Sequence, residues 1–222
     1  MDTDTLTQRL LRIDCCAVSD AMDKLGLKDR VASGLEQRST TRRIAGRVVT
    51  YRLVSAADAP APTGAPRHLG TTAIELAEPG EVIVVEQRTG IDAGSWGGIL
   101  TLGAKVKGIA GVVVDGPVRD IDEARSYGFP VYCRALTART ARTRVAEIEC
   151  NGPVTVGGVA VEPGDYVIAD ASGVAFVPAQ QAERVLDAAE TIAGREAAMA
   201  KALLEGKPIT EVMGADYEHM LR

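Results

Sequence analysis

The pattern of apolar and polar positions along this chain predicts a mixed α/β protein. Short apolar runs rich in β-branched residues and bounded by glycine or proline predict strands at residues 45–54, 82–86, 109–114 and 131–134. Helices are expected at residues 2–13, 68–78, 97–107 and 121–127. Another helix is expected to begin with Ser19 or Asp20 as its N-cap and to end at Gly26. With no linker or internal repeat, the pattern favours one α/β domain over residues 1–222.

The second half of the chain changes character. Four short strands separated by Gly-Gly and Pro-Gly-Asp turns predict a β-rich meander at Val154–Val156, Val159–Val161, Tyr166–Ala169 and Val174–Val177. Residues 179–205 predict one long Ala-rich amphipathic helix that ends at Gly206. Residues 55–66 are too rich in Pro, Ala and Gly for regular structure, so we expect a loop near an active-site mouth.

Composition narrows the class of protein. At 222 residues and 46% hydrophobic residues, the chain is long enough for one large domain with a sizeable core. No apolar run approaches the ~20 residues of a membrane span, and the acidic start of the sequence does not resemble a signal peptide. A net charge of −5 argues against a general nucleic-acid binder. The arginines at 134, 139, 142 and 144 are interpreted as a solvated or subunit-facing edge.

Several kinds of chemistry are excluded by the residues available. The four cysteines form no CxxC pair, which favours a reduced cytoplasmic compartment, and the presence of only two histidines argues against a zinc site. The nucleotide-binding patterns GxGxxG and GxxxxGK[ST] do not occur. A Schiff-base mechanism would need a desolvated lysine, for which Lys105 and Lys107 are the nearest candidates. Carboxylates are plentiful, so an oxygen-rich site would favour Mg²⁺ or Mn²⁺.

The most informative stretch is residues 97–122. It begins with the glycine-rich turn Gly97-Gly98, passes through a buried apolar strand, and ends in Arg119-Asp120. A strand that ends there delivers a cation and an anion to one edge of the sheet, and loops at strand ends often carry function. An isolated Arg-Asp dipeptide would more often be an idle surface ion pair, but the glycine-rich turn favours a site.

These residues resemble the regulator of ribonuclease activity A family, in the branch of 4-hydroxy-4-methyl-2-oxoglutarate / 4-carboxy-4-hydroxy-2-oxoadipate aldolases. Gly98, Arg119, Asp120 and Glu123 match the family's Gly-x20-Arg-Asp-x2-Glu/Asp pattern. Shorter matches at residues 18–23, 96–100, 163–165, 169–170 and 173–174 extend the resemblance over about residues 13–206. It implies a single-domain, three-layer β/β/α sandwich of the swivelling-domain type with a long C-terminal helix. At position 98 some members carry an acidic residue, for which Asp92 or Glu75 is a candidate replacement here.

The resemblance and the residues together suggest how a 2-oxo acid would be bound. Backbone N–H groups of Gly97, Gly98, Ile99 and Leu100 would hold its carboxylate. Arg119 would bind the carbonyl oxygen that becomes an enolate, and Asp120 would hold Mg²⁺ or Mn²⁺ mostly through water. By motif position, Glu196 resembles an acidic residue that reaches the metal's waters from a neighbouring subunit. The implied assembly is a homotrimer or hexamer.

Two functions from different classes remain. The first is a class II, divalent-metal-dependent aldolase that releases pyruvate from a 4-hydroxy-2-oxo acid, with oxaloacetate decarboxylase side activity. The second is a non-catalytic trimer that regulates an RNA-processing enzyme. The presence of Arg119, Asp120, the Gly97-Gly98 turn and Glu196 favours the enzyme. A lyase of the same fold with another substrate is a third alternative, since loop 55–66 gives no indication of specificity. We expect no direct nucleic-acid or membrane partner.

Overall fold

The computed structural model describes residues 5–61 and 67–214. The helices in chain order are α1 (Thr5–Leu10), α2 (Cys15–Lys24), α3 (Thr71–Leu76), α4 (Gly98–Lys107), α5 (Ile121–Tyr127), α6 (Ala182–Leu204) and α7 (Ile209–Val212), with a 3-10 turn η1 (Ala179–Gln181) before α6. The strands are β1 (Val31–Ala32), β2 (Glu36–Gln37), β3 (Ile44–Ser55), β4 (Val82–Glu86), β5 (Gly111–Val118), β6 (Val131–Leu136), β7 (Val145–Cys150), β8 (Val154–Val156), β9 (Val159–Val161), β10 (Tyr166–Ala169) and β11 (Val174–Val177). No helix of these residues is long and apolar enough to cross a bilayer.

One curled sheet organises the molecule. Its strands follow the order β1-β11-β10-β3-β4-β5-β6-β2, and β7 also pairs with β3. The long strand β3 accepts β10 along its first half and β7 along its second half, with antiparallel pairing to both. Strands β3 to β6 run parallel, so their carboxyl ends meet at one edge. Strand β4 is buried almost throughout, as is usual for a parallel strand covered on both faces.

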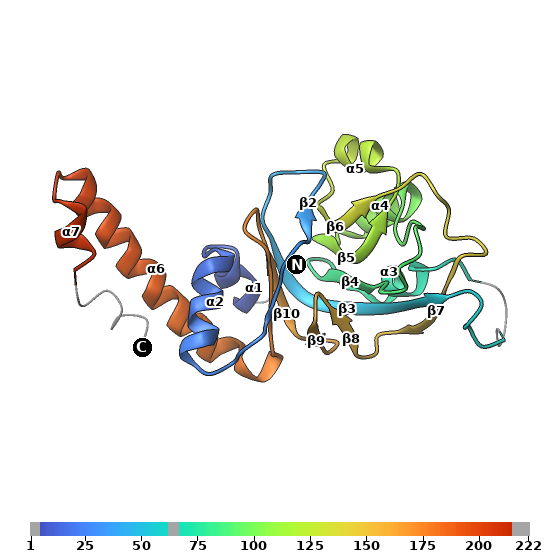
Figure 1. Cartoon of the computed structure of the whole chain (residues 1–222), viewed down its shortest axis with the longest axis horizontal. Helices are drawn as coiled ribbons and strands as arrows, with labels where there is room; N and C mark the ends of the chain where they lie inside the picture. Colours follow the sequence, from blue (N-terminus) through green and yellow to red (C-terminus); the bar gives the residue numbers. More distant parts are fainter. Residues whose placement is uncertain (1–4, 62–66, 215–222) are drawn as a thin grey trace.

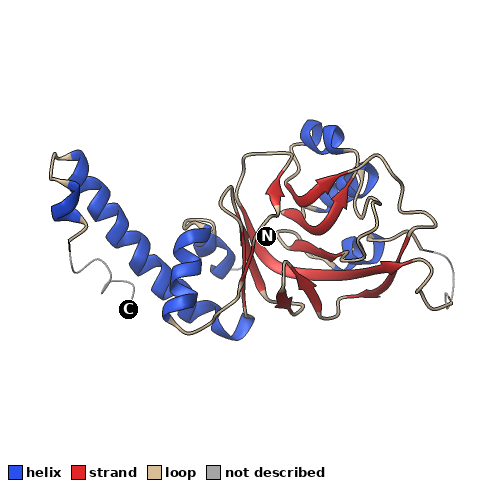
Figure 2. Cartoon of the chain, viewed as in Figure 1, coloured by secondary structure: helices blue, strands red, loops and turns tan. Residues whose placement is uncertain are grey.

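Separate layers cover the two faces of this sheet. Helices α3, α4 and α5 pack over one face of strands β3 to β6 (Figure 2). The two-stranded sheet β8-β9 covers the other face. A separate hydrophobic cluster joins α1, α2 and α6 to β10 and β11. The mixed α/β architecture with a long C-terminal helix confirms the expected fold class.

Helix α6 extends away from the sheet (Figure 1). Its buried residues share one face and end at Ile192, although the helix continues to Leu204: Ala182, Val185, Leu186, Ala189 and Ile192. The last 12 residues therefore extend about 18 Å beyond the core at 1.5 Å per residue.

Several element boundaries differ from the sequence predictions. The N-cap of α2 is Asp14, whose carboxylate accepts a hydrogen bond from the Ala17 amide at 2.8 Å, so the prediction of Ser19 or Asp20 was wrong. Helix α3 begins only after Gly70, whose left-handed backbone (φ 76°) prevents a helix from starting at residue 68. Strand β5 continues to Val118 through a bulge between Val114 and Pro117. Residues 2–4 of the first predicted helix and 62–66 of the predicted loop lie outside the described residues.

Candidate functional site

Two segments meet at the edge where the parallel strands end. The loop after β4 reaches α4 through Gly94-Ser95-Trp96-Gly97, and the end of β5 leads into Arg119-Asp120. Backbone hydrogen bonds join them, because the Arg119 amide donates to the Trp96 carbonyl at 3.0 Å and the Ser95 amide donates to the Pro117 carbonyl at 2.9 Å. The structure thus brings Gly97, Gly98, Arg119 and Asp120 together.

Asp120 links the two halves of the motif. Its carboxylate Oδ2 accepts a hydrogen bond from the Gly98 amide at 3.1 Å. Since Gly97, the N-cap of α4, has no side chain, Asp120 satisfies one of the free amides at the start of that helix. Asp120 itself adopts a left-handed backbone (φ 58°), a conformation that aspartate tolerates better than most residues. Of the amides in the expected carboxylate cradle, that of Gly98 is therefore already engaged.

Arg119 is oriented by the same carboxylate. Its Nε donates to both oxygens of Asp120, at 3.2 and 3.1 Å, and the two terminal nitrogens have no partner among residues 5–61 and 67–214. A Cβ at position 94 would lie 2.8 Å from Cγ of Arg119, so glycine is needed there for the arginine stem to lie against the loop. Gly94 was missed in the sequence, although its glycine-rich surroundings could have indicated it.

Glu123 occupies the space beside Gly98. A Cβ built at position 98 would overlap the Glu123 carboxylate, so this chain accommodates glycine at 98 together with an acidic side chain from α5. The other candidates for supplying that charge lie in different contexts. Asp92 forms an ion pair with Arg139 at 3.3 Å. The backbone carbonyl of Glu75 accepts a hydrogen bond from Lys107 at the other end of α4. Of these three residues, Glu123 is therefore the one whose carboxylate lies beside position 98.

Buried side chains hold the glycine-rich turn in place. The Trp96 indole donates to the Thr101 hydroxyl at 2.8 Å, and that hydroxyl donates to the Gly97 carbonyl at 3.0 Å. The Tyr51 hydroxyl donates to the Ser95 carbonyl at 2.7 Å. These positioning contacts were not predicted from sequence, because they join residues from three separate elements.

A half-buried glutamate lies near the first turn of α4. The Glu147 carboxylate accepts a hydrogen bond from the Gly70 amide at 2.6 Å, and Leu100 packs close to Gly70. Burial raises the pKa of Glu147 above its usual value, and the Gly70 hydrogen bond and His68 oppose this only in part. A carboxylate with a raised pKa thus lies beside Gly70, which Leu100 of α4 approaches, and no sequence motif indicated it.

Glu196 lies elsewhere in the same chain. It is exposed on the outer part of α6, while α4 and α5 lie on the opposite side of the molecule in Figure 1. Its pKa is raised first by partial burial and then by the negative charges of Asp14 and Asp20. Glu196 therefore belongs to an acidic group at α2 and does not join Arg119 and Asp120 within one chain.

The donor set fits a hydrated hard cation better than a tightly held metal. No group of three or more His, Cys, Asp or Glu in the described part of the chain could hold a metal ion. Asp120 and Glu123 nevertheless both lie beside Gly98. Mg²⁺ commonly uses one or two carboxylates and keeps several waters, so this pair is compatible with it. Lys105 and Lys107 lie in the last turn of α4, far from Gly97-Gly98, and both donate to backbone carbonyls. Neither lysine candidate for a Schiff base is therefore at the glycine-rich turn.

Comparison with known proteins identifies the family. The model of the RraA-like family, described as Aldolase/RraA, matches residues 15–176, and the chain belongs to this family. A Halalkalibacterium halodurans protein provisionally named 4-hydroxy-4-methyl-2-oxoglutarate aldolase is 40% identical over 115 residues, covering 51% of this chain and 54% of that protein. Protein DlpA of Legionella pneumophila is 28% identical over 206 residues, covering 93% of this chain and 33% of its own length. The chain thus spans about a third to a half of these two relatives.

Solved structures share the fold over nearly the whole chain. An uncharacterised protein from Pseudomonas syringae superposes with a TM-score of 0.84 at 25% identity, covering 96% of this chain and all of that one. Streptomyces coelicolor RraAS2 superposes with a TM-score of 0.77 at 26% identity, and the match covers 90% of this chain and all of that one. RraAS2 is described as an unusual member of the RNase ES inhibitor RraA protein family. The structural neighbours therefore include a member of a family described as inhibitors of RNase ES.

Proposed function

We propose that this chain is a class II, divalent-metal-dependent aldolase that cleaves a 4-hydroxy-2-oxo acid and releases pyruvate, with oxaloacetate decarboxylation as a side activity. The observation that carries the proposal is the convergence of the Arg119 guanidinium, the Asp120 carboxylate and the start of α4 at one strand edge. Relatives named as aldolases support the same class of reaction.

The substrate carboxylate would lie at the start of α4. Because the Gly98 amide is bonded to Asp120, the amides of Ile99 and Leu100, with that of Gly97, are the ones left to bind it. The terminal nitrogens of Arg119 would donate to the adjacent carbonyl oxygen, while Asp120 holds Nε from the opposite side. This arrangement places fixed positive charge where negative charge develops during the reaction.

The chemistry is a retro-aldol cleavage. The 4-hydroxyl gives its proton to a water held by Arg119, and its oxygen forms a carbonyl at C4 as the bond between C3 and C4 breaks. The C4 fragment leaves as the second carbonyl product, and the electron pair of the broken bond forms the enolate of pyruvate. Protonation of that enolate at C3 then yields pyruvate. A bound Mg²⁺ or Mn²⁺ would supply further positive charge beside the same oxygen, with Asp120 holding it mainly through water and Glu123 nearby. Oxaloacetate loses CO₂ through the same enolate.

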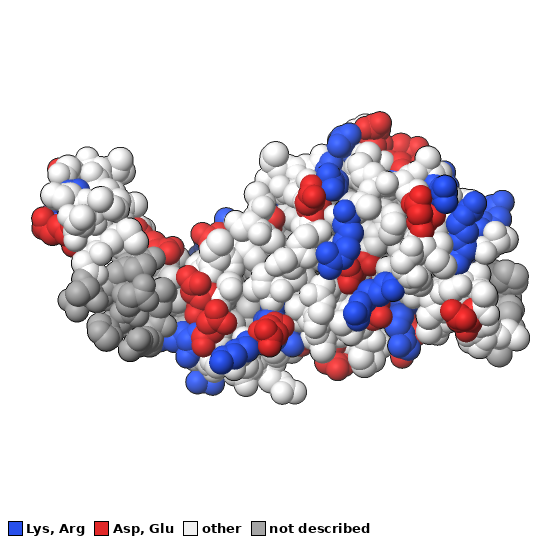
Figure 3. Space-filling view, viewed as in Figure 1, with Lys and Arg blue, Asp and Glu red and all other residues white. Residues whose placement is uncertain are grey.

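The separation of Glu196 from Arg119 supports a site shared between subunits of a homotrimer or hexamer. Among the described residues, those of α6 after Ile192 are not buried, and the exposed apolar side chains Leu203 and Leu204 lie at the helix end. Helix α4 also exposes Ile99 and Val106, at 82% and 81%. In Figure 3, Lys and Arg side chains gather toward the end of the molecule opposite α6. A cyclic assembly joins two different patches at each interface, so α6 of one subunit could bring Glu196 to the next subunit's Arg119.

The direct test is pyruvate release from a panel of 2-oxo acids that includes 4-hydroxy-4-methyl-2-oxoglutarate and oxaloacetate, each with and without Mg²⁺. We expect metal-dependent release from at least one 4-hydroxy-2-oxo acid, and loss of that release in Arg119→Ala. Folded protein that releases no pyruvate from any compound would contradict the enzyme. It would favour regulation of an RNA-processing enzyme, the alternative suggested by the similarity to RraAS2 and by the exposed apolar side chains Ile99 and Val106 of α4.

A further inference from the structure

A cavity lies at the edge of the sheet opposite the candidate site, where the parallel strands begin. It encloses about 460 Å³, within the usual range for small-molecule sites. Its wall combines α1, the segment that leads into β3, the end of α4, and the residues just before β4, β5 and β6. Helix α4 begins at the candidate active site and ends at this cavity, so the two sites are separate.

Glycines keep this cavity open. Gly80, Gly108 and Gly128 precede the three central strands and all have left-handed backbones, with φ of 90°, 84° and 61°. A side chain at any of these positions would be strained, and a Cβ at Gly80 would enter open space. The left-handed turns that start the strands therefore favour residues without a side chain at the rim of the cavity.

The interior combines an apolar floor with positive charge. Ile44, Ile109 and Phe129 are almost fully buried and line the floor. Arg42, Arg43 and Lys105 line the same cavity, whereas none of the lining residues is Asp or Glu. A compound that matches this cavity would therefore have an apolar body and carry a negative charge.

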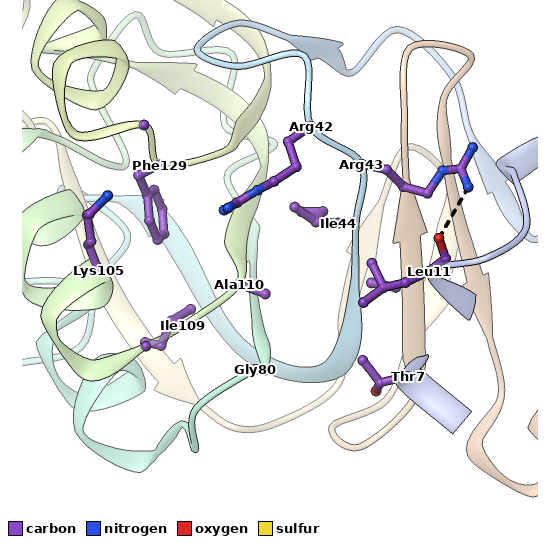
Figure 4. Close-up of a pocket in the computed structure, with 13 residues that line it drawn as sticks. Thr7, Leu11, Arg42, Arg43, Ile44, Gly80, Lys105, Ile109, Ala110 and Phe129 are labelled. Atoms are coloured by element: carbon purple, nitrogen blue, oxygen red, sulfur yellow. Dashed lines mark hydrogen bonds between the residues drawn. The ribbon is translucent and has the colours of Figure 1, made fainter. Parts of the chain in front are cut away.

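Only one of the three cations is uncommitted. Arg43 donates to the carbonyls of Leu11 and Ile13 and lies 3.7 Å from the Asp170 carboxylate. Lys105 donates to the Tyr127 carbonyl at the end of α5. The guanidinium of Arg42 has no partner in the described residues, and Figure 4 shows it extending into the cavity toward Phe129.

We propose that this cavity binds a small monocarboxylate with a ring-sized apolar body, its carboxylate on Arg42 and its body against Phe129, Ile44 and Ile109. One free guanidinium matches one carboxylate, which it can bind through two parallel hydrogen bonds. A doubly charged phosphate would need more donors, and the helix ends nearby present carbonyl oxygens that disfavour additional negative charge.

The test uses benzoate as the probe and follows backbone amide chemical shifts of the full chain. We expect saturable shifts at Ala110 and Phe129 that the neutral analogue benzamide and inorganic phosphate do not reproduce. Arg42→Gln should weaken binding about tenfold, the effect of one charged hydrogen-bonding partner. Ala110→Leu should abolish binding by filling the cavity, and Arg184→Gln, on the exposed face of α6, should leave it unchanged.

Each contrary outcome would overturn the proposal. Benzoate shifts confined to residues 97–100 would place the compound in the candidate active site, and competition by oxaloacetate would show the same. Equal binding of benzamide, or unchanged binding in Arg42→Gln, would exclude the role of Arg42. Phosphate binding as tight as benzoate would exclude the role of the apolar floor. As a control, the melting temperature of each variant is compared with that of the wild type. Equal values would show that weaker binding is not caused by unfolding.

Discussion

The carboxylate of Asp120 accepts a hydrogen bond from the backbone amide of Gly98, 22 residues earlier in the chain, at 3.1 Å. The same carboxylate accepts from Nε of Arg119. One side chain therefore sets both the start of α4 and the direction of the arginine. Asp120 thus has a structural role, and its negative charge has a separate proposed role in metal binding.

Two substitutions at Asp120 make that separation. Asp120→Asn retains an oxygen that can accept from Gly98 but removes the negative charge, so the fold should remain stable while more Mg²⁺ is needed for half-maximal activity. Asp120→Ala also removes the cap and should lower the free energy of unfolding by about 1 kcal/mol. Urea unfolding and Mg²⁺ titration of pyruvate release measure the two effects. An unchanged Mg²⁺ requirement in the Asn variant would remove Asp120 from metal binding.

Arg119→Lys tests geometry against charge. Lysine keeps the positive charge but loses the planar pair of donors, so kcat/KM should fall. The fall should correspond to a loss of about 2–4 kcal/mol of transition-state stabilisation, comparable to loss of an oxyanion donor. Steady-state pyruvate release measures this, with Arg184→Lys as a matched control on an exposed helix face. Near-normal turnover in Arg119→Lys would assign carbonyl polarisation to another group.

Sequence patterns identified the central elements because those elements depend on local signals. Strand β4 and helix α5 have the predicted bounds, since a short β-branched run and a helix ended by Gly128 are specified by their own residues. Strands β1 and β2 contain two residues each and form only because β11 and β6 offer pairing partners. No local pattern could indicate them. Strand β7 was likewise missed because its pairing with β3 is long-range.

The candidate site shows the same division. The family motif predicted that Gly98, Arg119, Asp120 and Glu123 act together, and the structure brings them to one strand edge. It could not predict that Asp120 uses the Gly98 amide or that Glu123 lies against Gly98, because both depend on how α4 packs beside α5. Whether Glu196 belongs to the site depends on a second subunit, so this stays a prediction.

The half-buried carboxyl of Glu147 predicts a pH effect on stability. Burial raises its pKa in the folded state, so folding favours the protonated form. The contribution of this group to stability is therefore greatest below its unfolded pKa and is lost as pH rises through the folded pKa. Glu147→Gln can still accept from Gly70, so its free energy of unfolding relative to wild type should increase from pH 4 toward pH 7. A constant difference across that range would show that Glu147 titrates normally.

The shared site can be tested by mixing subunits. Arg119→Ala and Glu196→Ala chains should each be nearly inactive alone. After joint unfolding and refolding, mixed oligomers should regain part of the activity, because some interfaces then combine an intact Arg119 with an intact Glu196 from a neighbour. Mixed oligomers that form but stay inactive would mean that Glu196 has no role or acts within its own subunit.

The rate of pyruvate formation from oxaloacetate before and after removal of divalent ions tests the central claim most directly. The measurement compares wild type with Arg119→Ala at equal Mg²⁺, which subtracts the decarboxylation caused by the free ion. We predict that exhaustive chelation abolishes the enzymatic rate and that Mg²⁺ or Mn²⁺ restores it in wild type only. Full activity after chelation, or equal rates for wild type and Arg119→Ala, would contradict a metal-dependent lyase acting through Arg119.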